Sequence, residues 1–193
     1  MTIKAESPFI AWPPAGARLL FVAQDPATSV HNLIPGSLPT AIASHFAGEG
    51  GGGRGRLPLP PREAVQAWLA QAGIDEHTAI VVYDGGNGSQ AARAWWVLNW
   101  AGYRRVSILA GGLNGWQAQA AQPQQQAAIT PSAGAFHEVT TEEIARRPHD
   151  FLLVDARNHA AFAGDGLVPS HLPAAINLPM AALQDEQGRL VAL

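Results

Sequence analysis

One loop of this sequence has the residue types and spacing of an anion-binding turn. It lies between an apolar run, Ala79–Tyr83, and a segment typical of a helix, Gln90–Ala101. A loop that curls at a helix N-terminus points several backbone N–H groups into one hollow, with the helix dipole behind them. Such a hollow lowers the pKa of a thiol and holds anionic groups. The candidates for this anion cradle are Asp84, Gly85, Gly86, Asn87, Gly88 and Ser89.

Asp84 stands first in the loop, where it brings its own negative charge into the hollow. An aspartate there satisfies the N–H groups internally and supplies no nucleophilic sulfur, so we interpret Asp84 as a structural cap rather than a catalyst. Arg93, one turn into the following helix, is a further candidate. It could neutralise Asp84 or a bound anion, or it could lie on the surface, and the sequence leaves both alternatives open.

The sequence contains no cysteine. It therefore holds no disulfide, no thiolate zinc ligand and no cysteine nucleophile. The seven histidines never occur at His-x-His or His-x-x-x-His spacing, so no metal site is predicted. No cofactor is expected either.

Two other chemistries fit the loop poorly. Ser89 lacks the flanking glycines of a hydrolase nucleophile elbow. The run Gly86–Ala91 matches a dinucleotide fingerprint only if Ala91 replaces the third glycine. No acidic residue ends a strand about 20 residues later, as that fingerprint requires.

The surrounding elements predict an α/β fold with a parallel sheet. Arg18–Ala23, Ala79–Tyr83 and Val106–Leu109 are short and almost wholly apolar, as strands buried on both faces are. A helix is predicted to open at Pro61 and to end at Gly73. The helix Gln90–Ala101 is apolar nearly all round, so we expect it to pack on the sheet. The run Gly48–Gly53 predicts a flexible surface excursion.

Charge and hydropathy exclude two classes of partner. The net charge is −3 and no basic stripe emerges, whereas phosphate-backbone binding needs clustered cations. No apolar run approaches the ~18 residues that a membrane span requires. We expect a cytoplasmic protein that binds neither nucleic acid nor membrane.

A second series of elements repeats the first more weakly. A predicted strand, Phe151–Val154, runs into Asp155-Ala156-Arg157 and then His171–Pro179, within which Ala175–Leu178 reads as another strand. Asp155 could contribute to a ligand site or accept N–H bonds from its own loop. Arg157 could supply charge for an anionic substrate or form a structural ion pair with Asp155. These two residues are the candidates of the second repeat.

Two stretches together resemble the tandem-domain rhodanese family of thiosulfate and 3-mercaptopyruvate sulfurtransferases. The first runs from Val81–Gly85 through Ala91–Trp96 to Gly111–Trp116 and is similar to the non-catalytic repeat. The second, Leu152–Arg157 followed by His171–Pro179, is similar to the opening of the catalytic repeat. The resemblance implies a parallel sheet of five strands flanked by helices in each repeat. It also implies a six-residue active loop whose first residue is a persulfide-carrying cysteine, and Asp84 occupies that position here.

The resemblance also implies the domain boundaries. We expect a rhodanese-like domain over residues 1–120, a linker over 121–136, and the N-terminal part of a second rhodanese-like domain over 137–193. The spacing of the first repeat places the second active loop near position 222 and the end of that repeat near 254, to within about ten residues. The uncovered strands of an incomplete repeat predict that this part of the chain is disordered, aggregates, or self-associates with another copy.

The second repeat departs from the family pattern at three positions. Ala161 stands about where a substrate-binding arginine is usual, and Ser170 and Ala174 stand where glycines flank the His-x-Pro motif. These differences put substrate binding in doubt.

The leading function is sulfur transfer from thiosulfate or 3-mercaptopyruvate to a thiol or cyanide, through a cysteine persulfide. The partners would be a small sulfur-containing anion and a thiol acceptor in the full-length protein, while these 193 residues alone are predicted to be inactive. The alternative is a catalytically inactive rhodanese-fold module for binding or regulation. A third, more remote hypothesis is an arsenate reductase or phosphatase of related fold. These enzymes also need a cysteine in the loop, so its absence weakens this hypothesis equally.

Overall fold

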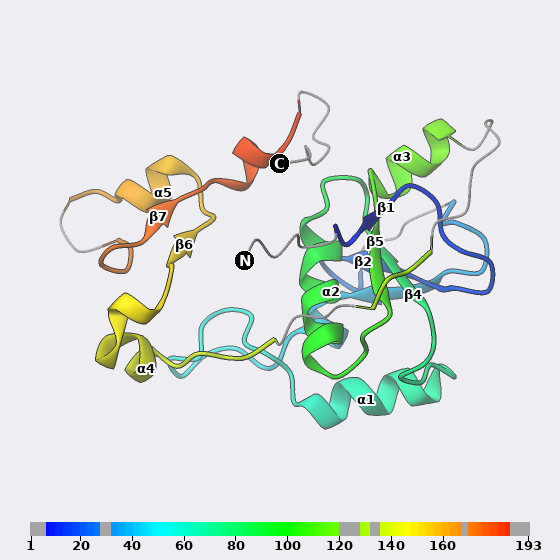
Figure 1. The fold of residues 1–193 in the computed structure, drawn as a ribbon, viewed down its shortest axis with the longest axis horizontal. Helices are drawn as coiled ribbons and strands as arrows, with labels where there is room; N and C mark the ends of the chain where they lie inside the picture. The colour runs from blue at the N-terminus through cyan, green and yellow to red at the C-terminus, as the bar shows by residue number, and fades with distance from the viewer. Residues whose placement is uncertain (1–6, 28–31, 120–127, 132–135, 167–169, 186–193) are drawn as a thin grey trace. The chain divides into compact units, whose positions relative to one another are not determined.

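A computed structural model describes residues 7–27, 32–119, 128–131, 136–166 and 170–185 (Figure 1). The chain forms two compact units, unit 1 over Met1–Phe136 and unit 2 over His137–Leu193. Each unit has its own sheet, and each is described by itself below.

Unit 1 is built on a five-stranded sheet in which every pairing is parallel, as predicted. The strand order is β1-β5-β4-β2-β3. Three strands were expected from the sequence and are confirmed, and two were not expected because one has only two residues and the other contains Pro39. The strands are β1 (Phe9–Ile10), β2 (Arg18–Ala23), β3 (Leu38–Ala41), β4 (Ile80–Tyr83) and β5 (Val106–Leu109).

The strand order marks the carboxyl ends of β2 and β4 as the expected position of a ligand site. These strands are neighbours, with Leu20 opposite Val82. From β2 the chain continues to β3 on one side, whereas from β4 it continues to β5 on the other side. Ligand sites of open parallel sheets lie where successive connections diverge in this way. The loop that starts at Asp84 leaves the sheet at this point.

One face of the sheet is covered by α1 (Arg62–Gln71), α2 (Ser89–Trp100) and the π-helical turn η1 (Ile42–Phe46). Val65 and Leu69 of α1 and Val97 and Leu98 of α2 are buried there. No residue of α2 is fully exposed, which confirms the expectation from its nearly continuous apolar surface.

The opposite face is covered by α3 (Gly112–Gln119) and by loop residues that include Ile34. The sequence did not predict α3, since it begins with glycine and contains a second one, Gly115, and glycine disfavours helix. Coverage of both faces explains why β4 and β5 are buried along their whole length and do not alternate.

The glycine-rich stretch after η1 lies at the surface, as the sequence predicted. Residues 49–56 are exposed, and Gly51 N–H bonds to the carbonyl of Gly55 in a local turn.

Unit 2 contains little regular structure in its described residues. α4 (Thr141–Arg146) begins with a capping box between Thr140 and Glu143. Two strands of two residues each, β6 (Val154–Asp155) and β7 (Ile176–Asn177), form a parallel pair, and α5 (His159–Ala163) lies between them in the chain. Short 3-10 turns, η2 and η3, span Pro148–Asp150 and Met180–Leu183.

The predicted strand Phe151–Val154 is wrong in extent, because only its last residue belongs to β6. Leu152 is 78% exposed. Its apolar character suggested burial, but in the described residues β6 pairs with β7 alone, which is too short to extend the ladder back to residue 151.

The predicted linker 121–136 is described only at 128–131 and Phe136. Ile129 is 9% exposed and belongs to the apolar cluster on the α3 side of the sheet. The described parts of this segment therefore belong to unit 1. Among the residues that the structure describes, no helix is long and apolar enough to cross a membrane.

Candidate functional site

The carboxylate of Asp84 lies at the centre of its loop, 1% exposed. Its Oδ1 accepts hydrogen bonds from the backbone N–H groups of Gly86 (2.9 Å) and Gly88 (3.1 Å). Its Oδ2 accepts from Gln90 (3.1 Å) and Ala91 (3.2 Å) in the first turn of α2. The hollow expected from the sequence is therefore present, and a side chain of the protein itself fills it.

The loop is clamped from its other side by the start of α3. Leu113 N–H donates to the carbonyl of Asp84 (2.8 Å), and Asn114 N–H donates to the carbonyl of Gly85 (3.3 Å). Gly112 makes this approach possible. A Cβ at Gly112 would lie 2.5 Å from the Asp84 carbonyl oxygen, and its φ of +54° disfavours any side chain.

The remaining polar residues of the loop bond to one another. Asn87 Oδ1 accepts from Ser89 N–H (3.0 Å), and Ser89 Oγ lies 2.9 Å from that same oxygen and 3.0 Å from Gln90 Oε1. Amide oxygens are not general bases, so Ser89 has none of the activation that a nucleophilic serine needs. The loop therefore holds an anion in place and supplies no nucleophile.

Arg93 does neither of the two things that the sequence suggested. Its Nε donates to the carbonyl of Phe46 (3.2 Å), and its Nη2 donates to the carbonyls of Leu57 (3.1 Å) and Pro58 (3.2 Å). The guanidinium is half-buried, and this burial lowers its pKa. Arg93 thus ties the two sides of the exposed stretch 49–56, the end of η1 before it and Leu57-Pro58 after it, to α2.

Sequence reasoning missed a pocket of about 250 Å³ at the carboxyl ends of β2 and β3. Asp25, Thr40, Ser44 and His45 are its polar lining residues, and Phe21 is among the apolar ones. Asp25 follows β2, and Ser44 and His45 follow β3, and ligand sites of parallel sheets lie after the carboxyl ends of strands. The pocket was not predicted because β3 was not recognised as a strand.

His45 is held in this pocket by its Nδ1 atom. The Nδ1 accepts from the backbone N–H of Ala41 (3.2 Å) and lies 2.7 Å from Ser44 Oγ. Burial lowers the pKa of His45 below its ordinary value of 6.5, because a charged imidazole is poorly solvated there.

In unit 2 Asp155 and Arg157 form a bidentate ion pair. Arg157 Nε lies 3.0 Å from both carboxylate oxygens, Nη2 lies 2.5 Å from Oδ2, and the backbone N–H of Arg157 also donates to Oδ1. The Arg157 side chain is the main cause that lowers the pKa of Asp155 to about 2. The expectation of a structural pair matches this geometry, and Arg157 Nη2 further donates to the carbonyl of Ser170.

The same pair lines an open pocket of about 510 Å³ with Ser170, His171, Leu172 and Pro173. His171 stacks on Phe162 with ring centroids 3.8 Å apart, and its Nδ1 lies 2.8 Å from the carbonyl of Phe162. Nowhere in the described ranges do three His, Asp or Glu side chains gather as a metal site would require.

Comparison with known proteins gives matches to one family, both for a family description and for individual relatives. The family description "Rhodanese-like domain" matches residues 29–119. The Mycobacterium tuberculosis (H37Rv) protein named "Putative thiosulfate sulfurtransferase SseB" is 32% identical over 169 residues, which cover 80% of this chain and 59% of the relative. The 3-mercaptopyruvate sulfurtransferase of Escherichia coli K12 is 34% identical over 143 residues, which cover 66% of this chain and 50% of the relative.

A solved structure agrees with these sequence matches. The crystal structure of SseA from Escherichia coli, described as a 3-mercaptopyruvate sulfotransferase with the "Rhodanese" fold, superimposes with a TM-score of 0.66 at 28% identity. The superposition covers 92% of this chain and 74% of SseA. The chain spans between half and three fifths of the length of the two relatives above. On these matches, and on its parallel sheet with a loop-to-helix cradle after β4, the chain belongs to the rhodanese family.

Proposed function

We propose that this chain is part of a sulfurtransferase in which unit 1 is the non-catalytic repeat. In the proposed reaction a cysteine thiolate outside these 193 residues attacks the outer sulfur of thiosulfate. The S–S bond breaks, sulfite leaves with the electron pair, and the cysteine becomes a persulfide. A thiol or cyanide then takes that sulfur and restores the thiolate. With 3-mercaptopyruvate as donor, the thiolate attacks the thiol sulfur and the C–S bond breaks. Pyruvate then leaves as its enolate, which takes the electron pair and picks up a proton from solvent.

The occupied cradle is the observation that carries this proposal. Four N–H groups converge on one point in front of α2, as a bound persulfide or sulfur anion would need. In unit 1 the Asp84 carboxylate already takes all four bonds, so the loop keeps its shape without sulfur. Relatives that are named sulfurtransferases extend well beyond the matched region, which leaves room for a loop with a cysteine.

The geometry of unit 2 supports its assignment as the opening of a second repeat. In unit 1, Pro35 and Gly36 (φ +80°) precede β3, and the first residue of β3, Leu38, pairs with Leu20. In unit 2, Pro173 and Ala174 (φ +63°) precede β7, whose first residue, Ile176, lies at the same distance from the proline. Ala174 thus adopts the left-handed conformation that glycine has in the first copy, although it carries a Cβ.

One observation favours a second candidate, a catalytically inactive module that binds a partner. Arg157, the candidate substrate-binding cation of the second repeat, is already bonded to Asp155 and to the carbonyl of Ser170, and Ala161 offers no replacement for a substrate arginine. Both candidates share the fold and the closed Asp84 loop, and they differ only in whether sulfur is transferred.

The test is to read the coding sequence beyond the codon for Leu193 and to assay the protein that it encodes. A cysteine-led loop near position 222, together with sulfur transfer from thiosulfate or 3-mercaptopyruvate to cyanide, is the expected result, and replacing that cysteine with serine should abolish the transfer. A protein without this cysteine, or one that transfers no sulfur from either donor, would refute the proposal and favour the binding module. For its location we propose the cytoplasm.

A further inference from the structure

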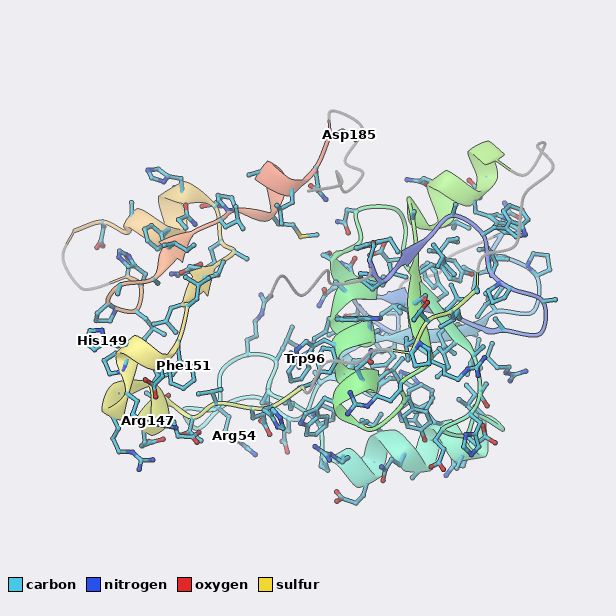
Figure 2. The ribbon with its side chains drawn as sticks, in the orientation of Figure 1. Arg54, Trp96, Arg147, His149, Phe151 and Asp185 are labelled. Atoms are coloured by element: carbon cyan, nitrogen blue, oxygen red, sulfur yellow. The ribbon has the colours of Figure 1, made fainter. Side chains whose placement is uncertain are left out.

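Two adjacent tryptophans on the outer surface of α2 hold one aromatic side chain from the far end of unit 1. Phe136 lies edge-on to Trp95 at 5.2 Å between ring centroids and edge-on to Trp96 at 6.1 Å, with interplanar angles of 82° and 87°. Edge-to-face pairs at these distances are attractive. We call Trp95 and Trp96 the aromatic seat; Figure 2 labels Trp96 at the surface of α2.

Contacts that do not involve Phe136 also hold the aromatic seat in place. Trp95 Nε1 donates to the carbonyl of Val106 (3.0 Å), which ties the indole to β5. Trp96 stacks on Trp100 at 6.4 Å, and the guanidinium of Arg62 lies 4.6 Å above the Trp100 ring. A rigid seat costs little entropy when it binds its occupant.

The seat forms an outer layer, distinct from the core beneath it. Ala94, Val97 and Leu98 of α2 are fully buried against the sheet, whereas Trp95, Trp96 and Phe136 are only half-buried. Losing Phe136 would therefore expose the tryptophan surfaces without opening the core. Ile129, seven residues earlier, is buried on the α3 side of the sheet. The described residues Ile129 and Phe136 thus contact opposite sides of the unit 1 sheet.

We infer that Phe136 in the aromatic seat is a latch: an intramolecular contact that holds the C-terminal end of unit 1 against α2 and that opens without unfolding the core of unit 1. Phe136 is the last residue of unit 1, so the latch fixes the point at which the chain leaves it. The inference depends on no catalytic activity and stands whether or not the chain serves sulfur transfer.

The experiment is peptide-resolved amide hydrogen exchange on the full chain. Phe136→Ala removes the occupant, and Trp96→Leu alters the seat from the other side. Phe151→Ala is the matched control, since it removes the same side chain from unit 2 (Figure 2). In Phe136→Ala the amides of residues 128–131 and 136–139 should exchange about tenfold faster, the change that two aromatic pairs correspond to. Trp96→Leu should accelerate the same amides in the same direction.

Two results would overturn the inference. An unchanged exchange rate for the amides of residues 128–131 and 136–139 in Phe136→Ala would mean that Phe136 does not hold this part of the chain on unit 1. Faster exchange of the β4 amides in that variant would mean that Phe136 belongs to the cooperative core and is no separate latch. Phe151→Ala should leave residues 128–139 unaffected, and an equal acceleration in this control would also count against the seat.

Discussion

The sequence could indicate the local role of Asp84, because every group that bonds to its carboxylate lies within seven residues of it. The loop composition and the following helix are both local features, so their geometry can be argued without the rest of the fold. His45 is the contrary case. Its pocket exists only because β3 pairs with β2, and a four-residue strand containing Pro39 gives no clear periodic signal.

Asp84→Asn should lower the free energy of unfolding of unit 1 by about 2 to 4 kcal/mol. The amide has one oxygen, so its NH₂ group would face two of the four N–H donors and leave them unpaired. Urea unfolding followed by tryptophan fluorescence measures the change. The control is Asp25→Asn, an exposed residue that accepts one bond from Ala27 N–H, and it should have no measurable effect. Equal stability of the two variants would contradict the importance of the cradle.

Arg157→Gln should raise the pKa of Asp155 from about 2 toward its ordinary 3.8, because the arginine side chain is the main cause of the lowered value. A carboxyl whose folded-state pKa is depressed stabilises the fold above its unfolded pKa. That contribution is lost as the pH falls from 3.8 toward 2. Carboxyl carbon NMR titration of the labelled protein measures this pKa, and Arg147→Gln, which removes the exposed pair with Asp150, should leave it unchanged.

His45 should make unit 1 less stable in mild acid. Its folded-state pKa is lowered by burial, so the folded state favours the neutral imidazole. Stability from this group is complete above the unfolded pKa of 6.5 and falls as the pH drops below that value. His45→Asn keeps an acceptor for the N–H of Ala41 but cannot be protonated. Its unfolding free energy should therefore change less than that of the wild type between about pH 7.5 and pH 5.5.

At the scale of elements, a strand or helix could be predicted from the sequence when its own residues determine it. It could not be predicted when it depends on contacts with residues distant in the chain. β2, β4 and β5 are apolar runs bounded by turn residues, and the structure places them within one residue of the prediction. α3 could not be predicted from its own residues, because Gly112 is required by its contact with the Asp84 loop and not by the helix. The two residues of β1 are a strand only because β5 lies beside them.

The contact between α3 and the loop can be tested with two glycines. Gly112→Ala should cost roughly 3 kcal/mol or more of unfolding free energy, since the new Cβ would collide with the Asp84 carbonyl at a positive φ. Gly85→Ala is the matched control, because a Cβ there meets nothing within 4 Å. Thermal unfolding of both variants tests this contact. Similar unfolding midpoints for Gly112→Ala and Gly85→Ala would show that α3 does not clamp the loop as described.

At the scale of the whole molecule, the large apolar side chains that are most exposed all belong to unit 2. Within the described residues they are Val139, Leu152, Val154, Leu172, Ile176 and Leu178. The sequence predicts a boundary at residue 137 and an uncovered sheet after it. It could not indicate which residues would remain exposed, because the extent of β6 depends on its partner strand.

These side chains predict concentration-dependent self-association of the isolated 193-residue chain through the β6–β7 pair. Val154 and Ile176 lie opposite each other, each 49% exposed. Replacing both with lysine should shift sedimentation velocity profiles toward the monomer. Val139→Lys changes a similarly exposed valine (44%) outside the sheet and should not shift the profile. Wild-type protein that stays monomeric at high concentration would refute this surface as a site of association.

The parallel sheet of unit 1 has a consequence for the order in which the protein can fold during synthesis. β1 precedes the other described strands in the chain, and among those strands it pairs only with β5, so Phe9 has no partner until Ile108 has been made. About a hundred residues separate these partners, which takes roughly 5 to 20 seconds at ordinary rates of translation. Until then one edge of the growing sheet has no cover and its first segment has no partner. The nascent chain is therefore most open to misassociation or to chaperone binding just before β5 emerges from the ribosome.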